Sequence, residues 1–125
     1  MSETVSDLGG LDILVNNAAI ASYGDVADMS LGDIDALLNI NVRAVVVASQ
    51  AAIPHLGQGG RIVSIGSCLA EHVPFGGSTV YAMTKSALPA FTRGLARELI
   101  SNEGAAQLTS LRGSCTDLLR QWSGE

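Results

Sequence analysis

The strongest constraint on the fold is a pair of short apolar runs that flank one long segment of helical periodicity. Leu11–Val15 and Arg61–Ile65 are rich in branched side chains and are bounded by turn-forming residues. Both runs predict strands, and Leu11–Val15 is typical of a strand buried on both faces, as in a parallel sheet. From Leu31 to Ile53 apolar residues recur at helical spacing, and Pro54 marks the end of that helix. Strand, crossover helix and strand predict an α/β fold with a partial doubly wound parallel sheet.

Turn and cap signals mark the ends of these elements. Ser30 is a candidate N-cap for the crossover helix, and Gly57–Gly60 predicts a turn before the second strand. A second long helical pattern starts near Ser78. Pro89 lies inside that pattern, where a proline is expected to kink the helix.

Beyond Gly104 the pattern changes. A doubly wound fold needs another buried strand there, yet residues 105–125 are rich in Gln, Ser and Arg and contain few β-branched residues. Only Cys115–Trp122 has the spacing of a short helix. We therefore expect a partial domain over residues 1–104 and a divergent tail over residues 105–125, and a truncated or frame-altered end is one hypothesis for that tail.

Composition excludes several kinds of partner. The chain has 125 residues, of which 47% are apolar, enough for one small domain. Its formal charge of −5 argues against nucleic acid and anionic membranes. We expect no apolar run as long as a membrane span, and the N-terminus has no basic or apolar stretch typical of a secretory signal. Cys68 and Cys115 form no disulfide framework or zinc pattern, so a reducing cytoplasm is the expected location.

Tyr81 and Lys85 form the most chemically suggestive pair. They stand four residues apart in the second helical pattern, so they share one face of that helix about one turn apart. A nearby ammonium favours the phenolate and is expected to bring the pKa of the tyrosine toward working pH, where a general acid is most efficient. The alternative is a lysine that snorkels past a half-buried ring, an arrangement that arises on many helices by chance.

Small and polar residues follow both predicted strands. Asn16-Asn17-Ala18-Ala19 comes after the first strand, and Gly66-Ser67-Cys68 comes after the second. Open α/β sheets bind ligands at these carboxyl ends, although a plain strand-to-loop cap explains the Asn-Asn pair equally well. Asn41 lies among apolar residues within the crossover helix. An asparagine there is more often a hydrogen-bonded core amide than a functional group.

Taken together, these residues resemble the central part of a short-chain dehydrogenase/reductase. The resemblance covers residues 4–103 and rests on four motifs in family order: the strand end Leu11–Ala19, Asn41 in an Asn-Val-Arg-Ala context, the strand Arg61–Ser67, and Tyr81 with Lys85 in a Tyr-x-x-x-Lys pattern. Ala19 replaces the last glycine of the family's Asn-Asn-Ala-Gly strand end. The segment from Arg61 to Glu98 is most similar to 3-oxoacyl-carrier-protein reductases and related sugar, polyol and steroid dehydrogenases.

The resemblance implies a Rossmann-like domain that transfers hydride between NAD or NADP and a small carbonyl or alcohol substrate. Tyr81 would donate the proton to the carbonyl oxygen, and Lys85 would lower the pKa of Tyr81. Ser67 would hydrogen-bond the substrate oxygen. Asn41 would hold a water that continues the proton relay to Lys85.

The resemblance also implies the cofactor contacts. Lys85 would hold the nicotinamide ribose beside Tyr81, while Asn16, Ala18 and Ala19 would pack near the adenosine ribose and help to tie the sheet together. The family's glycine-rich turn, which receives the cofactor pyrophosphate at a helix N-terminus, has no counterpart in the sequence. Gly57–Gly60 does not qualify, because it follows a helix and precedes a strand.

Two hypotheses therefore stand side by side. The first is an NAD(P)-dependent oxidoreductase. The second is a catalytically inactive truncated fragment, or an interaction module, that lacks a cofactor site. In the family the two long helices commonly form a four-helix dimer interface, so a homo-oligomer through these helices is expected in either case. A metal site is not expected, since the acidic residues are scattered, and no histidine motif supports hydrolysis.

Overall fold

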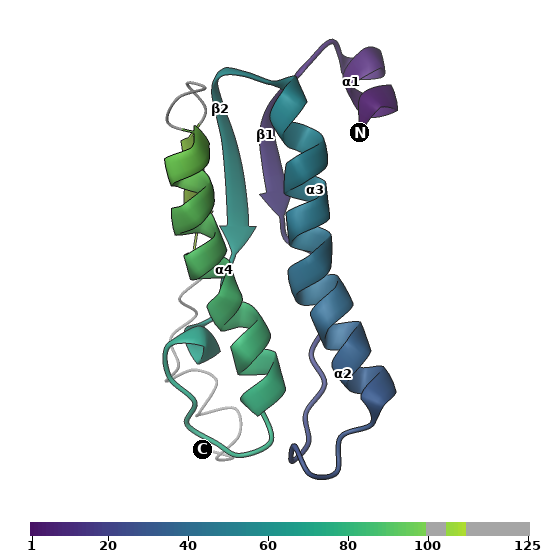
Figure 1. Cartoon of the computed structure of the whole chain (residues 1–125), viewed down its shortest axis with the longest axis vertical. Coiled ribbons are helices and arrows are strands. Elements are labelled where there is room, and N and C mark those ends of the chain that lie inside the picture. Colours follow the sequence, from purple (N-terminus) through teal and green to yellow (C-terminus); the bar gives the residue numbers. More distant parts are fainter. Residues whose placement is uncertain (100–104, 110–125) are drawn as a thin grey trace, which may run out of the picture.

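The structure is a computed structural model that describes residues 1–99 and 105–109. It contains a parallel sheet with the strand order β1-β2-β3, formed by Leu11–Asn16, Leu56–Ile65 and Ala105–Thr109. The short helix α1 (Ser2–Leu8) precedes the sheet and ends at Gly9, whose φ of 81° is a left-handed helix cap. Two long helical segments lie side by side in front of the sheet (Figure 1).

The crossover helix that joins β1 to β2 is built from four consecutive pieces. They are α2 (Leu31–Leu38), a π-helical turn (Asn39–Arg43), α3 (Ala44–Ala52) and a 3₁₀ turn (Ile53–His55). The predicted cap is confirmed, because the Ser30 hydroxyl accepts a hydrogen bond from the Asp33 backbone N–H at 3.0 Å. The predicted end is also confirmed, because Pro54 lies in the terminal 3₁₀ turn.

Strand β2 begins earlier than the sequence predicts. Leu11 pairs with Leu56 and Ile13 pairs with Arg61, so an irregularity in the ladder absorbs the glycine-rich segment Gly57–Gly60. Gly59 has a φ of 79°, and a Cβ on Gly60 would come within 3.0 Å of the Gly57 carbonyl oxygen. The segment is therefore a tight turn inside the strand, and it needs glycine at both positions.

A hydrophobic core joins the far part of α4 (Thr79–Leu99) to the sheet. Ile62 of β2 packs with Leu95 and Leu99 of α4, and the partly buried members of the cluster are Leu14, Ile53, Leu56 and Phe91. Pro89 lies inside α4, and the helix continues past it. Burial of these apolar side chains supplies the main stabilisation of the helix–sheet packing.

The prediction that β1 is buried on both faces is wrong for this structure. Leu14 belongs to the core cluster, but Ile13 is 56% exposed and Val15 is 53% exposed. The reason is geometric, because neighbouring residues of a strand point to opposite faces and both long helices lie on the same side of the sheet (Figure 1).

The prediction that no strand follows Gly104 is also wrong. Ala105–Thr109 forms β3, which pairs in parallel with β2 so that Arg61 lies opposite Ala105 and Ile65 lies opposite Thr109. The possible helix Cys115–Trp122 lies outside the described residues. The division of the chain at residue 104 stays a prediction.

The expectation that no apolar run approaches a membrane span needs a correction. By length and by a mean hydropathy of 1.5, the helical stretch Leu31–His55 is apolar enough to cross a membrane. This is weak evidence, because core helices of soluble proteins pass the same test. Leu37, Val45 and Ala52 of this stretch are buried in the fold.

Candidate active site

The predicted site residues cluster where β1 and β2 end and α4 begins. Asn16 is the last residue of β1, and Ser67 follows β2 after one intervening residue. Tyr81 and Lys85 lie in the first turns of α4, and Asn41 lies in the π-helical turn. Segments that are distant in sequence thus meet at the carboxyl ends of the strands, where parallel sheets bind ligands.

Asn41 is 1% exposed and connects three segments. Its Oδ1 accepts a hydrogen bond from the Ile20 N–H at 2.9 Å, and its Nδ2 donates to the Ile20 carbonyl at 2.8 Å and to the Thr84 hydroxyl at 3.1 Å. Thr84 in turn donates to the Tyr81 carbonyl at 2.7 Å. Both N–H groups of the Asn41 amide are therefore used. Because its partners are Ile20 in the loop after β1 and Thr84 in α4, Asn41 holds this loop against the helix that carries Tyr81.

Lys85 is buried to 5% exposure, and its Nζ donates to the carbonyl oxygen of Ile65, the last residue of β2, at 3.1 Å. Burial lowers the pKa of the Lys85 ammonium below its ordinary value of 10.5. Among the described residues this bond uses one of the three N–H donors, which leaves two for a ligand. A freely snorkelling surface lysine does not fit these observations.

Tyr81 is half-buried, and its ring lies against Tyr23 from the loop after β1, with the ring centroids 5.9 Å apart. Burial, and to a lesser extent Tyr81, raises the pKa of the Tyr23 phenol above its ordinary value of 10.0. Within the described part of the chain no group hydrogen-bonds the Tyr81 hydroxyl. That hydroxyl is therefore available to a substrate oxygen.

Ser67 begins the 3₁₀ turn Cys68–Ala70, and its hydroxyl accepts a hydrogen bond from the Leu69 N–H at 3.2 Å. The structure joins Ser67 to this local backbone rather than to Tyr81. Its hydroxyl proton is not used in that bond and remains available for donation. Ser64, by contrast, is 1% exposed within β2, so its hydroxyl is not open to a ligand.

Asn16 ties the sheet to the crossover helix. Its Nδ2 lies 3.3 Å from the Ser49 hydroxyl of α3 and 3.5 Å from the Ser64 hydroxyl of β2. Next to it is a cavity of about 230 Å³, which is lined by Leu14, Val15, Asn16, Asn17, Ala18, Ile40, Ala44, Val45 and Ala48. Ala18 and Ala19 are exposed, and Ala19 is not part of this lining.

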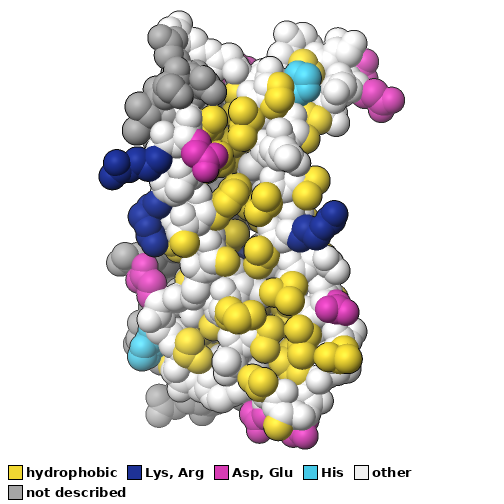
Figure 2. All heavy atoms as spheres, in the orientation of Figure 1, with side chains coloured by type: hydrophobic (Ala, Val, Ile, Leu, Met, Phe, Trp, Pro, Cys, Tyr) yellow, Lys and Arg dark blue, Asp and Glu magenta, His cyan; other side chains and the backbone are white. Residues whose placement is uncertain are grey.

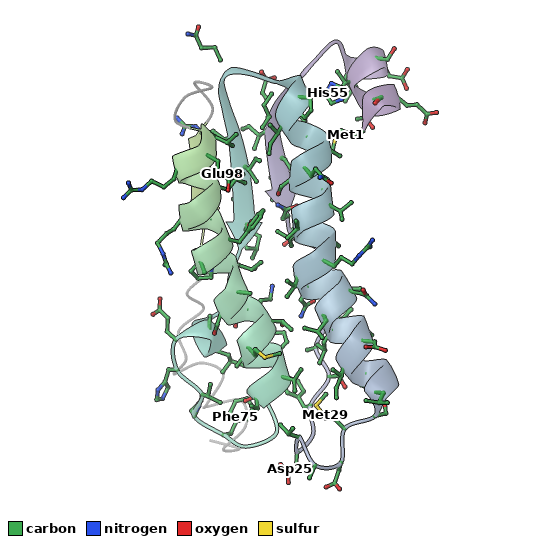
Figure 3. The ribbon with its side chains drawn as sticks, viewed as in Figure 1. Met1, Asp25, Met29, His55, Phe75 and Glu98 are labelled. Carbon is green, nitrogen blue, oxygen red and sulfur yellow. The ribbon has the colours of Figure 1, made fainter. Side chains whose placement is uncertain are left out.

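A second hollow lies between the two long helices. It measures about 340 Å³ and is lined by Val46, Ser49, Gln50, Ile53, Pro54, Phe91, Leu95 and Glu98. Figure 2 shows hydrophobic side chains along the strip between the helices, with charged side chains at its margins. Glu98 is seen on the side of α4 that faces α3 (Figure 3). In the described residues, His, Cys, Asp and Glu form no group of three able to hold a metal ion.

Tyr23 is the site residue that the sequence did not reveal. It stands in a loop without periodicity, and nothing in its local sequence links it to Tyr81. The one available signal is its position seven residues after Asn16, in the loop that leaves a ligand-binding strand end.

Comparison with known proteins gives a consistent result. A family model described as short chain dehydrogenase matches residues 1–112. The chain is 43% identical over 96 residues to the cyclic-di-GMP-binding biofilm dispersal mediator protein of Escherichia coli, an alignment that covers 77% of this chain and 40% of the relative.

Solved structures agree. A short-chain dehydrogenase/reductase from Serratia marcescens is 50% identical with a TM-score of 0.83, over 86% of this chain and 49% of that one. A short chain dehydrogenase from Burkholderia cenocepacia in complex with NADP is 48% identical with a TM-score of 0.85, over 96% of this chain and 53% of that one. The chain thus spans about half the length of the proteins that it matches.

Proposed function

The chain belongs to the short-chain dehydrogenase family, and we propose that its site transfers hydride between NADP or NAD and a small carbonyl or alcohol substrate. The observation that carries this proposal is Lys85, a buried lysine fixed by the end of β2 one helical turn from Tyr81. Burying an ammonium is costly, so such a group is retained where its charge acts on a neighbour or a ligand.

In the proposed reduction Tyr81 gives its phenolic proton to the carbonyl oxygen, and in oxidation it takes that proton back. The positive charge of Lys85 favours the phenolate that remains after the transfer. Ser67 donates its free hydroxyl proton to the same substrate oxygen and places it for Tyr81. Asn41 fixes the geometry of the Tyr81 turn through Thr84, and a water held beside it is the expected link to Lys85.

The residues fit two parts of a dinucleotide. The two unused donors of Lys85 suit the ribose hydroxyls next to nicotinamide. The cavity beside Asn16 and Ala18 suits the adenosine end. Bound nicotinamide would supply or accept the hydride. The residues of this sequence include no glycine-rich turn for the pyrophosphate.

An inactive fragment is the second candidate, which the exposed Ile13 and Val15 on the uncovered side of β1 favour. We also propose that copies of the chain associate through the strip between α3 and α4, where the hollow beside Phe91 and Leu95 is mostly apolar. A cytoplasmic location and a substrate such as a 3-oxoacyl thioester, sugar, polyol or steroid follow from the resemblance alone.

Titration of the purified chain with NADPH and with NADH, followed by nicotinamide fluorescence, tests the proposal. Saturable binding that is lost in Lys85→Ala and kept in Ser86→Ala supports a cofactor site. Ser86 is a suitable control, since its hydroxyl has the Ala70 carbonyl at 2.7 Å and the Ala82 carbonyl at 2.8 Å as alternative acceptors for its single proton. Absence of binding by a folded sample rejects oxidoreductase activity for this chain and leaves the fragment.

A further inference from the structure

The side of the sheet that faces away from the two long helices carries neighbouring apolar side chains. Leu14 belongs to the core cluster, so Ile13 and Val15 point to the opposite side of β1, where they are 56% and 53% exposed. Val63 pairs with Val15, Ile65 follows it on the same side of β2, and both are partly exposed. We call Ile13, Val15, Val63 and Ile65 the far-side patch. An apolar patch on one face of a sheet is a surface that another element is expected to cover.

The C-terminal segment of the sequence contains a matching apolar row. Four apolar residues recur at the spacing i, i+3, i+4 and i+7 of a single α-helical face, namely Cys115, Leu118, Leu119 and Trp122. Ser114 precedes this row and Asp117 stands three residues later, a pair typical of a capped helix start. The segment lies outside the described residues and beyond residues 1–112, which match the family. A helix of about eight residues is marginal alone in water, so this pattern needs a surface to fold against.

Strand β3 ends close to the far-side patch. Thr109, its last residue, pairs with Ile65, and the neighbouring pair joins Ser64 to the end of β1. Two strand spacings, roughly 10 Å, separate β3 from β1 across the sheet. Residues 110–114 can span up to about 17 Å when extended, so the segment that follows them can reach the patch. A helix of eight residues is about 12 Å long, enough to run back over Val15 and Ile13.

We propose that residues 115–122 dock as a short amphipathic helix on the far-side patch of the same chain. The contact removes two apolar surfaces from water at once, Trp122 and the leucines of the segment and the branched side chains of the sheet. A tethered segment has an effective concentration in the millimolar range, which favours it over a second copy at the micromolar concentrations of an assay. The inference is independent of the proposed hydride transfer, because Tyr81 and Lys85 have no part in it.

Trp122 is the single tryptophan of the chain, so its fluorescence reports docking directly. In the full chain we expect emission at a shorter wavelength than that of free N-acetyltryptophanamide, and weaker quenching by acrylamide. Ile13→Asp places a charge in the patch and should shift the ratio of docked to undocked segment at least about tenfold toward the undocked state. Val47→Asp is the matched control, because it places the same charge at a 44% exposed residue of α3 and should leave the emission unchanged.

A second pair of variants leaves the sheet unaltered. Leu119→Gln removes one apolar residue of the row and should expose Trp122 to acrylamide, whereas Arg120→Gln changes the polar side of the same helix and should not. Circular dichroism checks that the variants remain folded, and the second pair decides the question if Ile13→Asp does not fold.

A solvent-exposed Trp122 in the folded wild type would overturn the inference. Equal quenching of the two members of the second pair, or of folded Ile13→Asp and Val47→Asp, would also overturn it. The emission of the wild type should be the same at every chain concentration. A shift to shorter wavelength that develops only as the concentration rises would reject docking within one chain and identify a second copy as the occupant of the patch.

Discussion

Replacing Asn41 with leucine tests the hydrogen-bonded junction on which the site geometry depends. The substitution keeps the side-chain size but removes three hydrogen bonds, two to Ile20 and one to Thr84. At about 0.5–1.5 kcal/mol net for each bond, the free energy of unfolding should fall by about 1.5–4.5 kcal/mol. That is a large part of the stability of a typical domain, which is about 5–15 kcal/mol.

The assay is urea unfolding followed by far-ultraviolet circular dichroism, with the midpoint and slope compared between variants. Thr84→Val is the matched comparison. It removes one of the three Asn41 bonds together with the bond to the Tyr81 carbonyl, and should cost about 1–3 kcal/mol. Because the two residues share a bond, the double variant should lose less than the sum of the single losses. A loss below about 0.5 kcal/mol in Asn41→Leu would refute the reasoning, since it would mean that water replaces the amide without cost.

Lys85→Met should change how stability depends on pH. The pKa of Lys85 in the folded chain lies below its ordinary value of 10.5, so between the two values the unfolded chain binds more protons than the folded chain. The wild type should therefore gain stability relative to the variant as pH rises through this window. Urea midpoints of the two proteins that change in parallel across the window would contradict this expectation. Gly59→Ala should destabilise by about 1 kcal/mol or more because its φ is 79°, whereas Gly57→Ala, with open space at its Cβ, should be close to neutral in the same unfolding assay. Val46→Lys should shift the chain toward monomer in analytical ultracentrifugation, because Val46 lines the hollow between the helices. Val47→Lys is the control and should cause no shift, because Val47 is about equally exposed but does not line the hollow. Identical sedimentation profiles for the two variants would reject association through this strip.

The sequence predicts the parts of the fold that depend on local signals. The Ser30 cap, the stop at Pro54 and the apolar runs of β1 and β2 are all confirmed. The strand β3 is missed because Ala105–Thr109 has little β-propensity, and it forms through hydrogen bonds with the open edge of β2. The exposure of Ile13 and Val15 is missed because burial of the second face of the sheet depends on which elements cover that face. The local sequence of the strand does not indicate which elements these are.

For the site, the shared helical face of Tyr81 and Lys85 follows from their spacing alone. The Lys85 bond to the Ile65 carbonyl does not, because it depends on how closely α4 approaches the end of β2. The same limit applies to Tyr23, which meets Tyr81 because the Gly24 N–H donates to the Gly77 carbonyl and joins two loops that are far apart in sequence.

The π-helical turn has a consequence for how the crossover helix is phased. The buried residues Leu37, Asn41, Val45 and Ser49 follow one another at intervals of four. In a regular α-helix of 3.6 residues per turn, each such step rotates by roughly 40° beyond a full circle, so the row would turn progressively around the helix. The wider turn at Asn39–Arg43 takes up part of that rotation and keeps the row in line. Deleting one residue from this turn would restore the α-helical pitch and swing Asn41 away from Ile20 and Thr84. The number of residues in the crossover helix is therefore constrained by the contacts of Asn41, and a change of one residue would disrupt them.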